Sequence, residues 1–190
     1  MKTTVRRLLP VVAIVAALLA VAPVSPASAH GGRQAQRQSV TSLRLDPRAA
    51  AALQSLGVTA APIAPAFAND RGLNFPISGS LLNALFTRTI RHSGGIALTA
   101  GTTRVELTRF YVNVDRAPDL TTLVGGQRVS ILDLDLSTAS IRFRRGKFTV
   151  GPVAARLTQA AAAALNGAFG VTAFSKGLLL GQATVRARLF

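Results

Sequence analysis

Apolar and polar residues alternate in short runs along most of the chain after its first 39 residues, with turn residues between the runs. Alternation of this kind puts apolar side chains on one face of a strand and polar side chains on the other, and is typical of antiparallel sheet. In the first run, Ser42 and Arg44 face away from the neighbouring leucines. In the last run, 182–190, Arg186 and Arg188 face away from small and apolar residues. Both runs are predicted to be strands with one polar face.

Two stretches show helical periodicity and carry both a start and a stop signal. Asp46 as N-cap and Pro47 at the first helical position begin one helix, which Gly57 ends. Thr158 caps the other, five alanines follow, and Gly170 ends it. Each helix has one apolar stripe, formed by Ala49, Leu53 and Leu56 in the first and by Ala161, Leu165, Ala168 and Phe169 in the second. Helices of about ten residues are marginal in water, so both are expected to pack on the sheet.

Glycine-containing turns predict how the strands are joined. Ser93-Gly94-Gly95 predicts a hairpin between the runs on either side of it. The turn at 144–147 predicts a second hairpin, which pairs Ile141 and Phe143 with Phe148 and Val150. The long run 102–114 changes parity, which predicts a bulge or bend near Thr108 and Arg109.

These patterns together predict a mainly β fold. We expect an antiparallel β-sandwich or open barrel of about 8–11 strands with two short α-helices. Residues 40–190 are predicted to form a single domain, large enough to bury a core without crosslinks. The chain contains no cysteine, so packing alone must hold that domain together.

The N-terminal segment 1–29 has the features of a secretory signal peptide. Lys2, Arg6 and Arg7 form a basic region, an apolar stretch follows, and Ala27-Ser28-Ala29 is a small-residue cleavage site. The paired arginines leave a twin-arginine route open beside the ordinary one. Residues 30–39 are polar and are predicted to be a disordered lead-in. We expect a secreted protein, extracellular or loosely associated with the cell wall after cleavage near Ala29.

Charge indicates the kind of partner. The formal net charge is +15, and loss of segment 1–29 would leave +12, a balance that favours an anionic cell-wall polymer or a membrane surface. The alternative is a composition bias with a solvated arginine face. Candidate contact residues cluster on the second hairpin and the last strand: Arg142, Arg144, Arg145, Lys147, Arg186 and Arg188. No aromatic residue is interleaved with them on their predicted strand face to stack on bases, so nucleic acid is not predicted as a partner.

Few residues are available for catalysis. Two histidines and seven acidic residues supply no recognisable nucleophile, base and acid constellation, so no enzymatic activity is predicted. Asp133 and Asp135 share one strand face, which is expected to be solvated. A shared cation, or acid and base roles, is the alternative for this pair.

From about Leu43 to the end, the chain resembles a distant HtaA-type domain, a family found in exported actinobacterial haem-uptake proteins. The segments that carry the resemblance are LNFPISGS, IRHSGGIALTAG, RVELTRFYVNV, SILDLDL and ARLTQAAAAALNGAFG. The resemblance implies a β-rich fold with two short helices. It also implies haem held by a tyrosinate on the first helical segment, supported by a histidine.

The family's haem ligands are absent from the corresponding segments of this chain. RAAAALQSL has neither tyrosine nor histidine, and TAGTT stands where a histidine is expected after the glycine hairpin. Tyr111 and His92 are the replacement ligands that the rest of the domain offers, and neither occupies the family's position. No cofactor is therefore assigned, and haem stays an alternative.

We therefore expect an exported, non-enzymatic HtaA-like domain that binds an anionic or amphipathic ligand at the cell envelope. Haem binding or transfer with replacement ligands is one alternative, and a passive structural wall protein is another. Oligomeric state does not follow from the sequence.

Overall fold

The computed structural model describes residues 39–79, 81–124 and 126–188. The predicted signal peptide, 1–29, lies outside these residues, as does the predicted lead-in except for Ser39. Thirteen strands and three helices occur in the described ranges, and eight of the strands form a closed antiparallel barrel. Around the barrel these are β1 (Val40–Leu45), β13 (Leu179–Arg188), β12 (Lys147–Leu157), β10 (Gln127–Asp135), β9 (Asp119–Val124), β8 (Tyr111–Asn113), β5 (Thr89–His92) and β4 (Gly72–Ser78).

Strand β1 closes the barrel, because it pairs with β13 along one edge and with β4 along the other. Two further strands extend this sheet: β3 (Phe67–Asn69) pairs with β4, and β11 (Ser140–Arg144) pairs with β12. A separate three-stranded sheet contains β2 (Thr59–Ile63), β6 (Gly95–Ala100) and β7 (Thr103–Thr108).

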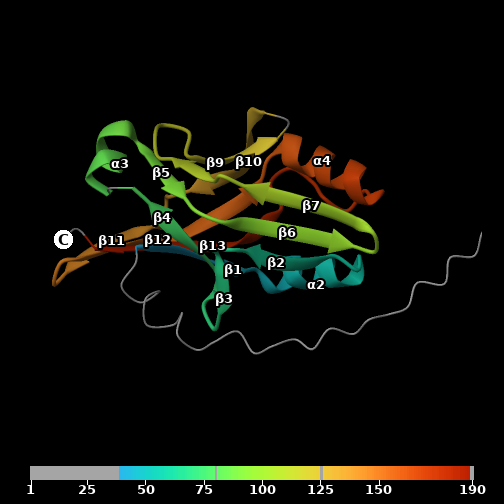
Figure 1. Ribbon diagram of the computed structural model, residues 1–190, viewed down its shortest axis with the longest axis horizontal. Coiled ribbons are helices and arrows are strands. Elements are labelled where there is room, and N and C mark those ends of the chain that lie inside the picture. The colour runs from blue at the N-terminus through green and yellow to red at the C-terminus, as the bar shows by residue number, and fades with distance from the viewer. Residues whose placement is uncertain (1–38, 80, 125, 189–190) are drawn as a thin grey trace, which may run out of the picture.

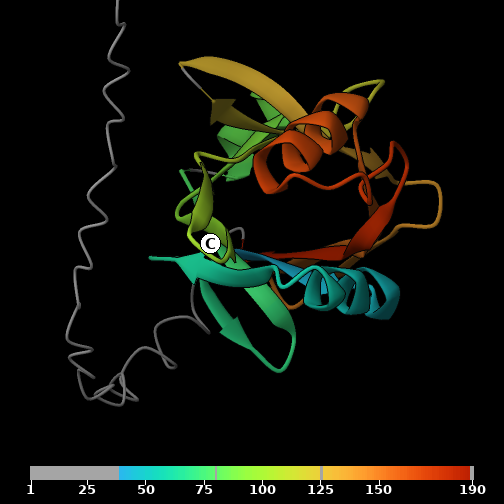
Figure 2. The same cartoon turned by 90° about the vertical axis from the view of Figure 1, so that its right-hand side faces the viewer.

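The three helices lie at the two ends of this body. Helices α2 (Pro47–Ser55) and α4 (Gln159–Phe169) lie at the same end, on either side of the barrel (Figures 1 and 2). Helix α3 (Leu81–Thr87) and the β11–β12 hairpin lie at the opposite end (Figure 1). Among the described residues, no helix combines the length and the apolar character that crossing a membrane requires.

The capping signals of both predicted helices act as expected. The Asp46 side chain accepts a hydrogen bond from Arg48 N, and Pro47 occupies the first turn of α2. The Thr158 hydroxyl accepts one from Ala161 N, and Gly170 ends α4 in the left-handed conformation, at φ 64°. Apolar residues of both helices pack on one core cluster around Leu132, Ala155 and Leu157, which supplies the stability that helices of this length lack by themselves.

Strand parity sets the inside and the outside of the barrel. Leu43 lies opposite Leu73 and Thr41 lies opposite Phe75, and this inward face of β1 and β4 includes residues of both core clusters. Phe75 also meets Phe110 edge to face, with ring centroids 5.4 Å apart. The residues between these positions, Ser42 among them, therefore lie on the outer face.

The mainly β barrel with short helices is confirmed, and two local predictions have clear outcomes. The second hairpin is correct, since Ile141 pairs with Val150 and Phe143 with Phe148. The first hairpin is wrong: β5 and β6 flank the glycine turn but belong to different sheets. At Gly95 a Cβ would lie 2.3 Å from the Leu107 carbonyl oxygen, so glycine serves the close pairing of β6 with β7 there.

The run 102–114 bends where its parity changes. Arg109 adopts φ 54°, and the halves on either side become β7 and β8, in different sheets. Such breaks, together with three-residue strands such as β3 and β8, raise the strand count above the expected number. Closure of the sheet by β1 makes the barrel closed rather than open.

Gly181 lies where β1 approaches β13, and Gly167 on α4 provides a comparison without such a contact. A Cβ at Gly181 would lie 2.2 Å from the Arg44 carbonyl oxygen, whereas one at Gly167 on α4 would meet nothing within 4 Å. We expect Gly181→Ala to lower the free energy of unfolding by about 1–3 kcal/mol. Gly167→Ala should raise it by about 0.5–1 kcal/mol, because alanine has the higher helix propensity. Urea denaturation measures both, and equal effects of the two substitutions would contradict the close approach of these strands.

Candidate functional site

The register of three neighbouring strands gathers basic side chains on the outer face of the barrel. Arg144 of β11 lies opposite Lys147 of β12, which lies opposite Arg188 of β13. In the adjacent row, Arg142 and Arg186 flank a threonine of β12. Directly paired residues of antiparallel strands share a face, so these five side chains form one surface. We call it the arginine face.

Arg145 sits at the turn that ends this surface. Arg145 and Gly146 have φ 50° and 72°, the two positive values of a type I′ hairpin turn. The left-handed region favours glycine or asparagine and is costly for a long side chain. The turn therefore carries an exposed arginine where a less strained residue would fit.

The opposite face of the same hairpin is apolar and exposed. Ile141 is 70% exposed and Phe143 is 56% exposed. The β11–β12 hairpin is therefore amphipathic at the end of the molecule that also carries α3 (Figure 1).

The arginine face is not neutralised by acidic residues. Arg104–Glu106 is the only ion pair among the described residues, and no acidic residue occurs in β1, β11, β12 or β13. Most acids elsewhere hold local structure: Asp46 caps α2, Asp115 and Asp135 accept from nearby backbone amides, and Asp119 accepts from Asn113. Hydrogen bonds from the Ser137 side chain and backbone lower the pKa of exposed Asp135, with a smaller effect from Arg156.

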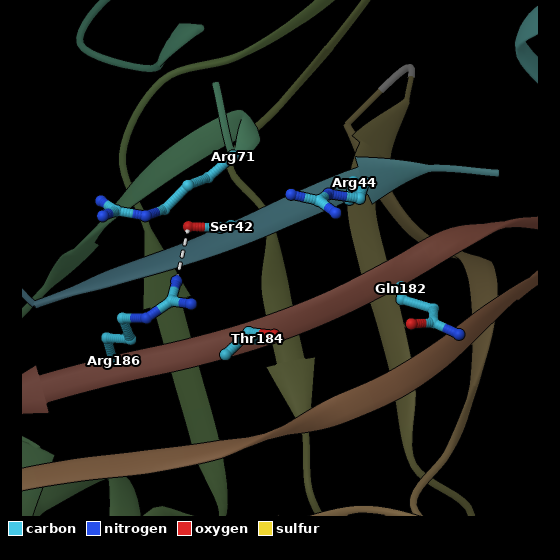
Figure 3. A pocket seen from close by; sticks show the side chains of 6 residues that line it. All are labelled: Ser42, Arg44, Arg71, Gln182, Thr184 and Arg186. Carbon is cyan, nitrogen blue, oxygen red and sulfur yellow. Dashed lines mark hydrogen bonds between the residues drawn. The ribbon is translucent and has the colours of Figure 1, made fainter. Parts of the chain in front are cut away.

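A pocket of about 310 Å³ adjoins the arginine face on the outer side of β1 and β13. Figure 3 shows the six residues that line it, which come from β1, β13 and the β3–β4 turn: Ser42, Arg44, Arg71, Gln182, Thr184 and Arg186. Register explains the grouping, because Ser42 lies opposite Thr184, and Arg44 lies opposite Gln182. We call this the arginine pocket. Arg186 belongs to both the pocket and the arginine face, so the two surfaces are continuous.

Buried hydrogen bonds fix one side of the arginine pocket. The Ser42 hydroxyl is 5% exposed and donates to Asn74 Oδ1 at 2.7 Å. Its oxygen then accepts from Arg186 Nη1 at 3.3 Å, the contact drawn in Figure 3. Asn74, which is 2% exposed, donates in turn to Asn69 Oδ1 at 2.9 Å. Arg186 is thereby oriented by a hydroxyl and a carboxamide that are themselves buried.

The two replacement haem ligands lie on opposite sides of the sheet. Tyr111 is on the outer face, where the Arg128 guanidinium lies 3.6 Å and that of Arg91 lies 5.2 Å from the ring centroid. His92 points into the barrel, and its Nε2 is 2.7 Å from the Thr41 hydroxyl. Tyrosine and histidine therefore do not converge on one iron position. The residues present do not fit the family's haem arrangement.

Burial controls the titration of His92. The imidazole is 6% exposed and its Nδ1 has no hydrogen-bond partner. Burial lowers the pKa of His92 to about 4, against a smaller opposite effect of the Phe110 backbone. The side chain is thus a neutral core residue at physiological pH.

Asp133 and Asp135 lie exposed on β10, as their parity predicts. In the described part of the chain, no group of three or more His, Cys, Asp or Glu side chains is placed to hold a metal ion. The pair therefore gains no third ligand from its surroundings.

Comparison with known proteins adds no relative: neither the protein-family models nor the curated proteins contain a match to this chain. The site must therefore be interpreted from its own chemistry.

Sequence reasoning found the arginine face residues but missed most of the arginine pocket. The outward parity of Ser42 and Arg44 was the available signal, and the C-terminal strand supplied Arg186. What joins them is the pairing of the first strand with the last, which no local pattern encodes. Arg71 gave no signal, because it stands alone in a short turn.

The His92 pKa predicts a pH dependence of stability. Between about pH 6.5 and 4 the unfolded chain binds a proton that the folded barrel does not, so the free energy of unfolding falls as pH falls through this window. The difference amounts to about 3 kcal/mol. The neighbours of the imidazole, Thr41, Ile77 and the Phe110 backbone, do not titrate.

Urea denaturation of the protein and of His92→Gln across this pH range measures the effect. We expect the free energy of unfolding of His92→Gln to change less with pH between about 6.5 and 4 than that of the unsubstituted protein. This holds whatever stability the substitution costs at about pH 7. Parallel slopes for the two proteins would contradict a buried neutral histidine.

Proposed function

We propose that this protein is a non-enzymatic binding domain that holds an anionic polymer of the cell envelope on its arginine face. The observation that carries the proposal is the register of β11, β12 and β13, which lines up five cationic side chains without an acid among them. Like charges placed side by side on a sheet destabilise it. A bound polyanion would relieve that repulsion.

The spacing of the arginine face suits a chain of repeated charges. Neighbouring strands lie roughly 4.8 Å apart, and residues two apart on one strand lie roughly 6.7 Å apart. Each exposed ion pair in such a grid is weak and screened by salt. Binding would therefore depend on many simultaneous contacts and on ionic strength.

The cellular setting is part of the proposal. The basic, apolar and small-residue regions of segment 1–29 favour export, and kinship with HtaA-type domains is consistent with a β barrel carrying short helices. An envelope polymer is then the polyanion within reach. The placement of Tyr111 and His92 offers no support for haem as the ligand.

An anionic membrane surface is a second candidate, favoured by one observation. Exposed Ile141 and Phe143 lie on the hairpin that also carries Arg142 and Arg144, and apolar anchors beside basic residues suit lipid interfaces. The arginine face continues instead along β13 to a polar pocket, away from these apolar side chains. We therefore favour a polymer, and vesicles of anionic lipid are the comparison arm of the experiment below.

Sedimentation with purified cell walls tests the proposal. The protein should bind at low ionic strength and be released as salt approaches about 1 M, where the Debye length falls to about 3 Å. Replacing Arg142, Arg144 and Arg188 by glutamine should weaken binding about tenfold or more, since each loses a charge-assisted contact.

The control variant replaces three exposed basic residues outside the arginine face, Arg48, Arg116 and Lys176, with the same change in net charge. It should retain most of the binding. Equal losses of wall binding in both variants would show that net charge, and not the arginine face, determines binding. Binding to vesicles that is abolished by Phe143→Ser, with none to walls, would overturn the polymer in favour of the membrane.

Arg145 separates stability from binding within the same hairpin. Arg145→Asn should raise the free energy of unfolding by about 1 kcal/mol, because asparagine tolerates φ 50° better. The same substitution should weaken wall binding, because it removes one cation from the end of the arginine face. Thermal unfolding and sedimentation measure the two effects, and unchanged wall binding would remove Arg145 from the contact surface.

A further inference from the structure

The arginine pocket has a composition that exposed barrel surfaces do not need for folding. Three guanidinium groups, two hydroxyls and one carboxamide line about 310 Å³, with no acid among them. The guanidinium groups come from three separate elements: Arg44 from β1, Arg186 from β13 and Arg71 from the β3–β4 turn (Figure 3). Their mutual repulsion is uncompensated by any ion pair.

Close backbone contacts bring the β3–β4 turn to the pocket. Gly72 has φ 104°, and a Cβ there would lie 2.3 Å from the Leu43 carbonyl oxygen. Only glycine allows the turn to meet β1 so closely. The Asn69 side chain accepts from Arg71 N at 2.9 Å, which holds the turn that carries this arginine.

Preorganisation extends beneath the pocket floor. The Ser42 hydroxyl donates its proton to Asn74, so its oxygen is available as an acceptor for Arg186. Asn74 also donates to the Gly72 carbonyl oxygen at 2.7 Å, on the turn that holds Arg71. One buried asparagine therefore connects the Arg186 side chain and the backbone of the turn that carries Arg71, which lowers the ordering that a ligand must impose at these two positions.

We propose that the arginine pocket binds a phosphate monoester carried on a polyol or sugar. Arginine forks match phosphate oxygens in bidentate geometry, and a tetrahedral phosphoryl group accepts hydrogen bonds from several directions at once. A carboxylate offers two oxygens in one plane. The dianionic monoester also balances more of the threefold positive charge than a carboxylate does.

The rest of the lining suits what the phosphate is attached to. Thr184 and Gln182 lie on the same outer face of β13 as Arg186, and hydroxyl and amide groups exchange hydrogen bonds with hydroxyls of a polyol. The pocket has the size of a small-molecule site rather than that of a single ion. This inference rests on the proposed function, because a polymer on the arginine face would reach the pocket through Arg186.

Calorimetric titration of the full chain with glycerol 3-phosphate, inorganic phosphate and glycerate at constant ionic strength tests this site. At about pH 7.5, where the monoester is mainly dianionic, glycerol 3-phosphate should bind about tenfold tighter than glycerate, which carries a similar polyol on a carboxylate. Inorganic phosphate should lie between them. Equal affinity for glycerol 3-phosphate and glycerate would overturn the proposal.

Substitution locates the binding. Arg44→Gln and Arg71→Gln change exposed side chains and should each weaken glycerol 3-phosphate binding about tenfold, with thermal unfolding as a check on folding. Arg116→Gln, which changes an exposed arginine outside both the pocket and the arginine face, should leave that affinity unchanged. Binding of glycerol 3-phosphate that ignores both pocket substitutions would overturn the site.

A wall-binding arm separates this inference from the proposed function and distinguishes the source of the ligand. Phosphatase treatment of the walls removes terminal monoesters and should lower binding of the natural protein to the level of Arg71→Gln. Wall binding that depends on the arginine face but not on Arg71 would overturn only the inference that the pocket binds the polymer. The proposed function would stand. Wall binding that ignores the arginine face, with pocket titration intact, would overturn the proposed function alone and leave a site for free phosphate esters.

Discussion

The pairing of β1 with strands from both ends of the domain is the interaction on which the rest of the structure depends. All six of its residues pair with β13 on one side, and Val40 to Leu43 pair with β4 on the other, so this strand turns an open sheet into a barrel. Leu43 packs against both core clusters from the inner face. Ser42 and Arg44 then face outward beside β13 and the β3–β4 turn, which supply the other pocket residues. Core and pocket are thus two faces of one short strand.

Local chemistry made much of the fold predictable. Asp46, Thr158 and Gly170 fix helix ends through contacts within a few residues, and the 144–147 turn fixes the register of its hairpin by its own geometry. The hairpin predicted at the glycine turn before β6 was wrong because that prediction, too, used only local signals. A local signal cannot show that the next strand leaves the sheet, because this choice depends on which distant strand offers an apolar face.

The candidate site, too, has a part that local patterns predict and a part that depends on distant strand pairing. Hairpin arginines were predictable because alternation gives their face, and their grouping with β13 needed only one pairing. The arginine pocket needed two more, since Ser42 and Arg186 are 144 residues apart and Arg71 reaches them through a hairpin packed against β1. Closure of a chain over such separations is decided by the whole core, so single-strand patterns contain no trace of it.

Tyr111 has one more consequence. It is the only tyrosine, and the chain contains no tryptophan, so tyrosine fluorescence from the folded domain arises from a single ring that Arg91 and Arg128 flank. That ring sits on β8, four strands around the barrel from β13. The protein therefore has a built-in fluorophore on the wall opposite its arginine face, where a change in emission on binding to that face reports deformation of the barrel rather than direct contact.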